Sequence, residues 1–374
     1  MTPTTRKRPG QVRDAVMSVL GEALQPLAVA DIYEGVRARV GEDCALSSVR
    51  SYLRLNEGSS VLRVARGQYA LPGACDPPTD GVIPDPLFTF GQSAFFQGDC
   101  FGWLASREPN SIQAVVTDPP YGLVEYSREQ QSKLRNGSGG VWRIPPSFDG
   151  HARSPLPRFT TLTPGDLRNL EVFFARLGRL LVRVVVPGGH VLIASNPLLS
   201  YIVSHAVVQS GFERRGEIVR LVMTMRGGDR PKNAHQEFAD VSVMPRSMWE
   251  PWLLFRKPLE GRVQDNLRRW KTGGLRRISD AQPFGDVIES HPARMSERAI
   301  AAHPSLKPQA FLRRVVRAML PLGEGVVLDP FAGSGSTLAA AEAVGYRSIG
   351  VEDDPEFVAM ARAAIPQLAA LASR

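Results

Sequence analysis

Four consecutive residues, Asp118, Pro119, Pro120 and Tyr121, follow an apolar run at positions 112–116 and could carry out chemistry on an amino group. The Asp118 carboxylate and the Pro119 carbonyl can accept the two hydrogens of an amine whose lone pair is delocalised into an aromatic ring. Such acceptors stabilise the positive charge that develops on the nitrogen. The two prolines stiffen the turn, and Tyr121 offers a flat face for stacking a base. The alternative is a proline-rich turn with a capping aspartate.

A second pattern is the glycine-rich stretch that follows the apolar run 326–329. Gly333 and Gly335 would let a ligand approach the backbone closely. A diphosphate-binding turn would usually carry a third glycine where Ala340 stands. Glu352 comes about 20 positions later, where an acidic residue suits ribose hydroxyls; its alternative role is to cap a helix. The pattern favours a cofactor that has a ribose and needs no phosphate cradle.

Two weaker signals accompany these motifs. Lys307 lies in the segment 303–308, just before an expected helix at 309–320, and places a cation about 20 residues before the glycine turn. Asp99 follows a short apolar run. It could bind the adenine of a cofactor or cap a helix, and the sequence leaves both roles open.

The elements that must position these residues alternate between strand and helix from about residue 93 onward. Such alternation is typical of a parallel sheet covered by helices, and ligands of such sheets bind at the carboxyl ends of the strands. The expected strands are 94–97, 112–117, 190–194, 217–221, 252–256, 326–329 and 348–351.

Residues 1–72 predict a small separate domain. Apolar residues recur at helical spacing in three segments, and the runs 61–64 and 68–71 flank Arg66-Gly67 as in a hairpin. Three helices followed by a hairpin is a winged-helix layout, in which Arg50, Arg54 and Arg66 could meet DNA. A protein-contact module is the alternative. Residues 73–92, rich in Pro, Gly and Asp, are expected to be a linker, so that the second domain covers 93–374.

The composition narrows the classes of function. A net charge of +8 over 374 residues suits a polyanionic partner such as double-stranded DNA. The three cysteines are far apart, which argues against a disulfide framework and a structural zinc site, and we expect no metal. No apolar run is long enough to span a bilayer and no signal peptide is evident, so a cytoplasmic location is expected.

Together these features resemble the DNA amino-methyltransferases that act on adenine N6 or cytosine N4. Residues 118–121 resemble their catalytic DPPY motif, and 331–335 resemble their FxGxG cofactor motif. Residues 303–308 are similar to their HPTxKP element, with Ser305 replacing the usual Thr. The likeness covers roughly residues 93–365. Because the catalytic motif precedes the cofactor motif, the order resembles the circularly permuted β class.

The resemblance implies a seven-stranded, Rossmann-like α/β sheet, S-adenosyl-L-methionine as cofactor, and catalysis on a base flipped out of DNA. The cofactor-binding residues that it implies are Asp99, Lys307, Asp329, Phe331, Gly333, Gly335, Thr337 and Glu352. It also implies a target-recognition segment within about 225–300. The N-terminal winged helix is not part of the family core, so its role cannot be inherited.

Basic residues between the two motifs are candidates for DNA contact, because they can neutralise phosphates and grip guanine. One group lies in the stretch 262–277 and another in 226–233; solvated loops are the alternative. The candidates are Arg230, Lys232, Arg268, Arg269 and Lys271. The long stretch 127–149 could close over a substrate or be a surface loop.

The residue at position 118 bears on which base is methylated. Cytosine-N4 enzymes of this family tend to have Ser where Asp118 stands, so adenine is preferred and cytosine N4 is the alternative. RNA methyltransferases more often have Asn there, and an inactive winged-helix regulator is a further alternative. A cytosine-C5 enzyme would need a cysteine nucleophile in a Pro-Cys dipeptide, which is absent. A homodimer and a cognate restriction or defence protein are also expected partners.

Overall fold

Three helices pack together near the start of the chain, as their apolar spacing predicts. In the computed structural model they are α1 (Gln11–Glu22), α2 (Val29–Val40) and α3 (Leu46–Leu55). Their core is built from side chains that are fully or almost fully buried, namely Val16, Leu20, Ile32, Val36, Val49 and Leu53. The structure describes residues 10–23, 26–41, 43–56, 61–65, 67–71, 85–120, 164–226, 230–231, 234–243, 245, 247–303 and 305–372.

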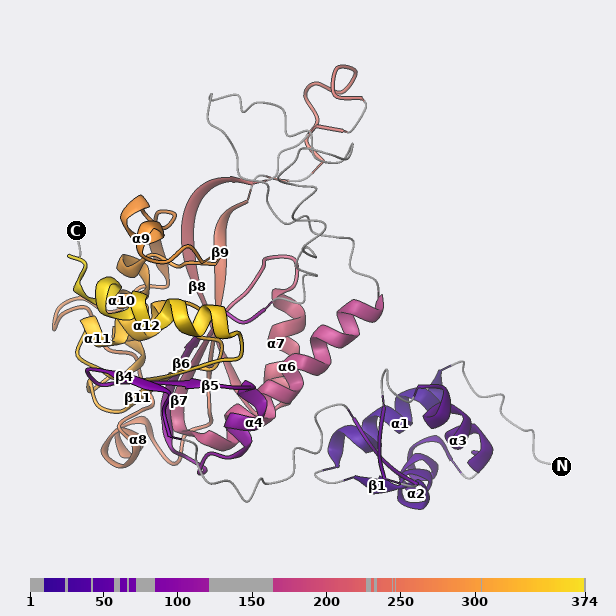
Figure 1. Cartoon of the computed structure of the whole chain (residues 1–374). Helices are drawn as coiled ribbons and strands as arrows, with labels where there is room; N and C mark the ends of the chain where they lie inside the picture. Colours follow the sequence, from indigo (N-terminus) through magenta and orange to yellow (C-terminus); the bar gives the residue numbers. More distant parts are fainter. Residues whose placement is uncertain are drawn as a thin grey trace.

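A small antiparallel sheet completes this N-terminal unit. Strands β2 (Leu62–Ala65) and β3 (Gln68–Ala70) form the expected hairpin, and the short strand β1 (Leu27–Ala28) pairs with β3. The sequence had not indicated β1, because two residues carry too little alternation to register as a strand. Figure 1 shows the unit in indigo.

The expected linker at 73–92 extends too far toward the C-terminus. Residues 88–90 form strand β4 (Phe88–Phe90), which pairs antiparallel with β5 (Ser93–Gln97). The ring of Phe88 stacks on Phe95 with centroids 4.9 Å apart. The larger domain therefore already includes residue 88, and the Pro and Gly residues upstream masked the strand in the sequence.

The larger domain is built on a nine-stranded sheet of mostly parallel strands, in the order β10-β8-β9-β7-β6-β11-β12-β5-β4. The resemblance implied seven strands, and β4 and β10 are the additional edge strands. Strand β9 runs antiparallel to both of its neighbours. The remaining strands are β6 (Ile112–Thr117), β7 (Val185–Ala194), β8 (Glu213–Arg226), β9 (Ser247–Arg256), β10 (Val287–Ser290), β11 (Val326–Asp329) and β12 (Arg347–Glu352).

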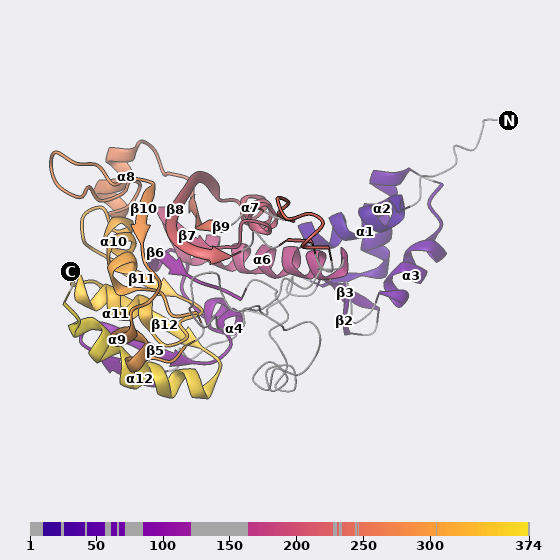
Figure 2. The same ribbon diagram turned by 90° about the horizontal axis from the view of Figure 1, so that it is seen from above.

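Helices cover both faces of this sheet because successive strand residues point to opposite sides. Val115 of β6 packs in a core with α4, α6 and α7, whereas its neighbours Ala114 and Val116 pack in a second core with α10 and α11. Figures 1 and 2 show these two layers. The helices are α4 (Cys100–Ala105), α6 (Pro164–Val184), α7 (Ser200–Gln209), α8 (Val263–Trp270), α9 (Met295–Ile300), α10 (Gln309–Met319), α11 (Ser336–Ala343) and α12 (Pro355–Ala370).

The sheet has its switch point between the adjacent parallel strands β6 and β11. From β6 the chain crosses by α6 to β7 on one side, and from β11 it crosses by α11 to β12 on the other. The crossovers diverge there, so a crevice opens beyond the carboxyl ends of the two strands, where ligands of such sheets bind. Among the described residues, no helix is long and apolar enough to cross a membrane.

Candidate active site

The two sequence motifs meet at this switch point. Thr117, the last residue of β6, donates its hydroxyl hydrogen to a carboxylate oxygen of Asp329, the last residue of β11, at 2.7 Å. Asp118 follows Thr117 directly, and Phe331 follows two residues after Asp329. Residues more than 200 positions apart in the chain are thus joined at neighbouring strand ends.

One pocket contains most of the predicted catalytic and cofactor-binding residues that the structure describes. Asp118, Lys307, Asp329, Phe331, Gly333 and Thr337 all line it. His303, Ser305, Ala332 and Ser334, which belong to the two motif segments 303–308 and 331–335, also line it. The sequence had not indicated a role in this site for the other lining residues, which are Trp252, Leu312 and Ser336. Tyr121, Arg66, Lys232 and the stretch 127–149 lie outside the described residues, as does Pro304 of the 303–308 segment.

The glycine turn needs its glycines for conformation and for space. Gly333 and Gly335 have φ angles of 51° and 77°, in the left-handed region that side chains disfavour. A Cβ on Gly335 would lie 2.4 Å from Cγ1 of Ile365 in α12. The turn therefore packs closely on α12, which fixes the start of α11.

Glu352 ties this turn to the end of the next strand. Its carboxylate accepts hydrogen bonds from the Gly333 N–H at 2.8 Å and from the Asp354 N–H at 3.0 Å. Asp354, not Glu352, caps α12 by accepting from the Glu356 N–H. Glu352 thus lies beside the turn, where an acidic residue can meet a ribose.

Burial changes the acidity of Asp329 at the centre of the site. Its burial raises the pKa of the carboxyl to about 6, against the opposing effect of hydrogen bonds from Thr337, Thr117 and the Phe331 N–H. His303 is also perturbed, because burial lowers its pKa. The imidazole of His303 lies against the glycine turn, where a Cβ on Gly333 would be 3.0 Å from its Nε2 atom.

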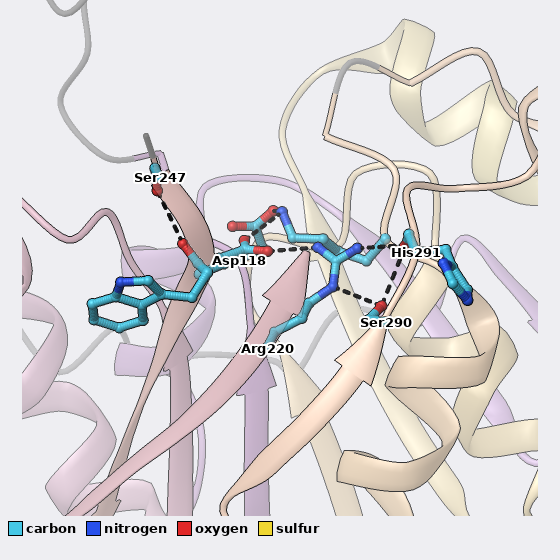
Figure 3. A network of polar contacts seen from close by, with 8 residues as sticks. Asp118, Arg220, Ser247, Ser290 and His291 are labelled. Carbon is cyan, nitrogen blue, oxygen red and sulfur yellow. Dashed lines mark hydrogen bonds and ion pairs between the residues drawn. The ribbon is translucent and has the colours of Figure 1, made fainter. Parts of the chain in front are cut away.

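Lys307 lies between two carboxylates. Its ammonium forms an ion pair with Asp118 and a second one, at 3.2 Å, with Glu250 of β9. Burial would lower the pKa of Lys307, but the charges of Asp118 and Glu250 raise it above its ordinary value. Figure 3 shows the contacts around Asp118 and Arg220. The sequence placed Lys307 near the cofactor; the structure adds a direct contact with Asp118.

Sequence reasoning missed Glu250 and Arg220, which complete this charge network. They lie on neighbouring antiparallel strands and face each other as register partners. No local motif surrounds either residue, because their partners come from distant parts of the chain. The signal that could have found them is a charged residue inside an otherwise apolar strand. Burying such a charge is costly unless it is paired.

Asp99 takes one of the two roles left open. Its side chain accepts a hydrogen bond from the Gly102 N–H at 2.8 Å and so caps α4. It also stands at the end of β5, next to the end of β12, since the Gly98 N–H donates to the Glu352 carbonyl at 2.9 Å. The contact of Asp99 with the adenine of the cofactor stays a prediction.

The basic residues predicted to contact DNA do not gather at one place. Arg268 and Arg269 lie on α8 and Lys271 ends it. Asn266 of that helix donates to the carbonyl of Pro187, near the start of β7, at 2.9 Å. Because β6 and β7 are parallel, α8 lies near the amino-terminal ends of these strands, whereas Asp118 follows the carboxyl end of β6. Figure 1 shows α8 at that end of the sheet. Arg230, in contrast, is exposed between β8 and β9, at the same end of the sheet as Asp118.

Comparison with known proteins agrees with this geometry. The family model N6_N4_Mtase, described as DNA methylase, matches residues 112–363. The chain belongs to this family of DNA methylases. The enzyme is therefore an S-adenosylmethionine-dependent DNA methyltransferase with a Rossmann-like fold, as the motifs predicted.

Relatives and a solved structure extend the match over most of the larger domain. The type II methyltransferase M2.DpnII of Streptococcus pneumoniae is 24% identical over 283 residues, which cover 75% of this chain and 92% of the relative. The DNA adenine methyltransferase YhdJ of Escherichia coli (strain K12) is 34% identical over 128 residues, 30% of this chain and 43% of the relative. The structure of the cytosine-N4-specific PvuII DNA methyltransferase matches with a TM-score of 0.50 and 14% identity, covering 78% of this chain and 90% of that chain.

The residues at the strand ends fit S-adenosylmethionine. Phe331 offers an apolar ring at the glycine turn, and Glu352 offers carboxylate oxygens that suit ribose hydroxyls. Gly98, which is hydrogen bonded to the end of β12, has open space where a side chain would stand, because a Cβ there would meet no heavy atom within 4 Å. A cofactor can approach the backbone at this point.

Proposed function

We propose that the enzyme methylates N6 of an adenine flipped out of double-stranded DNA, with Asp118 as the catalytic carboxylate. The observation that carries the proposal is the position of Asp118. It follows β6 at the switch point and lines the same pocket as the glycine turn of β11. An acceptor at this point lies beside the region proposed to hold the methyl donor.

The side chains suggest how the transfer proceeds. Bound S-adenosylmethionine supplies a methyl group on a positively charged sulfur. Asp118 and the carbonyl of Pro119 accept the two amino hydrogens, so that the nitrogen lone pair turns toward the methyl carbon. The N–C bond forms as the C–S bond breaks, and the nitrogen then loses one proton to solvent. Tyr121 is assigned the stacking of the flipped base.

Two observations support adenine as the target. An aspartate occupies position 118, where cytosine-N4 enzymes of the family tend to have serine. The relative with 34% identity is named as an adenine methyltransferase. Cytosine N4 is the second candidate, because the cytosine-N4-specific PvuII enzyme shares the fold.

A cysteine-dependent reaction has less support. Cys44 and Cys100 are both buried, and burial raises the pKa of the Cys100 thiol. A thiol with a raised pKa is a poor nucleophile. Cys100 therefore does not suit the covalent step of a cytosine-C5 enzyme. The buried Cys44 belongs to the core of the N-terminal unit, and Cys75 lies outside the described residues.

The N-terminal unit is proposed to be a winged helix that contacts DNA. Arg50 and Arg54 are both exposed on α3 and lie one helical turn apart, so they share a face. Arg230 is also proposed to contact DNA, and the DNA contacts of Arg66 and Lys232, which lie outside the described residues, stay predictions. Dimer formation and a cognate restriction or defence protein stay predictions of the family resemblance.

The proposal is tested by incubating the protein with unmethylated genomic DNA and labelled S-adenosylmethionine. The DNA is then digested and the labelled nucleoside is identified by mass. We expect N6-methyladenine from the wild type and from the control Asp280→Ala, which changes an exposed aspartate, and none from Asp118→Ala. Labelled N4-methylcytosine would show that the target is cytosine N4, the second candidate. An active Asp118→Ala variant would remove Asp118 from the mechanism.

A further inference from the structure

A chain of four alternating charges runs from the catalytic pocket into the sheet. Asp118 pairs with Lys307, Lys307 with Glu250, and Glu250 with Arg220, whose Nη1 atom donates at 2.6 Å. The residues come from the end of β6, the segment before α10, and strands β9 and β8. The two carboxylates and two cations balance, so this group of four side chains has no net charge.

These groups are largely withdrawn from solvent. The side-chain exposures are 6% for Arg220, 12% for Lys307, 14% for Asp118 and 21% for Glu250. Buried charges are costly unless they are paired in good geometry, and replacing one partner leaves the other uncompensated. A network of this kind fixes its members in place, and only its Asp118 end belongs to the DPPY motif.

Arg220 is held in place at the far end of this group of four charged side chains. Its three donor groups each have an acceptor, namely Glu250, the Ser290 hydroxyl at 3.0 Å and the His291 carbonyl at 2.9 Å. Its guanidinium also lies 5.2 Å from the ring centroid of Phe311. Figure 3 shows Arg220 with its contacts to Ser290 and His291. Arg220 therefore holds the Glu250 carboxylate in one orientation.

Glu250 in turn determines how Lys307 can act on Asp118. With Glu250 in place, the ammonium is shared between two carboxylates. Without that charge, Lys307 would pair with Asp118 alone and withdraw more electron density from it. Asp118 would then be a weaker acceptor for the amino hydrogens of the target base.

We propose that Glu250, held by Arg220, is a positioning residue that fixes Lys307 and through it the orientation and acceptor strength of Asp118. The inference rests on the proposed role of Asp118 in methylation. A purely structural role for the same network would alter folding and leave the pH dependence of the methylation step unchanged.

The first test compares Glu250→Gln with a matched control, Glu289→Gln. Glu289 lies on β10, the strand next to β8, which carries Arg220, and its side chain is exposed. In steady-state methylation of unmethylated DNA, Glu250→Gln should lower kcat by about 100-fold, the cost of misplacing a catalytic group by about 1 Å. Because Lys307 also lines the pocket beside the glycine turn, kcat is compared at saturating S-adenosylmethionine, and the control should match the wild type.

The second measurement is the pH profile of kcat. The charge of Glu250 raises the pKa of Lys307, so its removal makes Lys307 lose its proton at a lower pH. Uncharged Lys307 no longer forms the ion pair that orients Asp118, so kcat of Glu250→Gln should fall at a lower alkaline pH than kcat of the wild type. Glu250→Asp, which keeps the charge, should restore the wild-type profile. An unchanged kcat and profile in Glu250→Gln would overturn the inference, as would a loss of kcat that the folded fraction fully explains.

A third readout does not depend on methylation. Acylation of Lys307 by an amine-reactive ester, followed by peptide mass spectrometry, should be faster in Glu250→Gln than in the wild type and the control. Equal rates would overturn the inference even in an active enzyme. A wild type that methylates no DNA would instead overturn the proposed function, and the acylation rates would still decide whether Glu250 controls Lys307.

Discussion

The hydroxyl of Thr117 donates to the carboxylate of Asp329 at 2.7 Å and joins the ends of β6 and β11. Both residues are buried. This bond holds the strand that carries Asp118 against the strand that carries the glycine turn. It therefore sets the distance between the proposed catalytic carboxylate and the cofactor-binding residues.

Thr117→Val removes this bond while keeping the side-chain shape. We expect the free energy of unfolding to fall by about 1–3 kcal/mol, because a buried carboxylate loses one of its donors. Urea unfolding at pH 7 measures the change. Thr89→Val, in which the side chain is exposed on β4, should have little effect. Equal stability of the two variants would show that Asp329 does not depend on Thr117.

Glu352→Gln tests the cofactor site. Glu352 accepts from two backbone N–H groups with its two oxygens, whereas Gln offers a single acceptor and no charge. Gln would also weaken the charge-assisted hydrogen bonds that Glu352 is proposed to accept from the ribose hydroxyls. Losing one such bond costs about 1.5–3 kcal/mol, so the affinity for S-adenosylmethionine should fall by about 10- to 100-fold. Calorimetric titration provides the Kd. The exposed Glu356→Gln control should bind as the wild type does, and an unaltered Kd in Glu352→Gln would exclude Glu352 from the site.

The buried His190 of β7 predicts a loss of stability in acid. Burial lowers its pKa from 6.5 to about 3, and its Nδ1 atom has no hydrogen-bond partner among the described residues. Between these two values the unfolded chain binds the proton and the folded chain does not. Stability due to neutral His190 is thus present above pH 6.5 and is lost as the pH falls toward 3, with a slope of up to about 1.4 kcal/mol per pH unit.

His190→Leu isolates this contribution because leucine does not titrate. The free energy of unfolding, measured in urea from pH 7 to pH 4.5, should fall less steeply in the variant than in the wild type. Acid effects on other groups are common to both proteins and cancel in the comparison. Parallel curves would mean that His190 is protonated equally in the folded and unfolded states.

Two pairs of arginines test which surface meets DNA. We expect Arg50→Gln with Arg54→Gln, on α3, to weaken DNA binding and to reduce the slope of log affinity against log salt by about 2, since each lost phosphate contact removes about 0.9. The matched pair Arg268→Gln with Arg269→Gln lies on α8, at the other end of the sheet from Asp118. It should leave the affinity for DNA and the salt slope unchanged. Fluorescence anisotropy over a salt series measures them. A larger effect from the α8 pair would place DNA at that end of the sheet.

The family of the enzyme, its cofactor and much of its larger domain could be predicted from the sequence. Strands 112–117 and 326–329 were predicted with the bounds that the structure has, because buried parallel strands are continuous apolar runs bounded by turn residues. The motifs that follow these strands were recognisable because their function depends on residues adjacent in the chain. Their meeting at one end of the sheet followed from the rule that ligands bind at strand carboxyl ends.

Tertiary structure alone decided which distant residues surround Asp118 and which basic residues share its end of the sheet. Glu250 and Arg220 join the site through strand pairing between β8 and β9, and pairing over that distance leaves no local pattern. The basic helix α8 lies at the other end because Asn266 and Thr272 bind the carbonyl of Pro187. Charge along a sequence shows what a segment can bind, whereas its direction in space is set by the packing of its buried face.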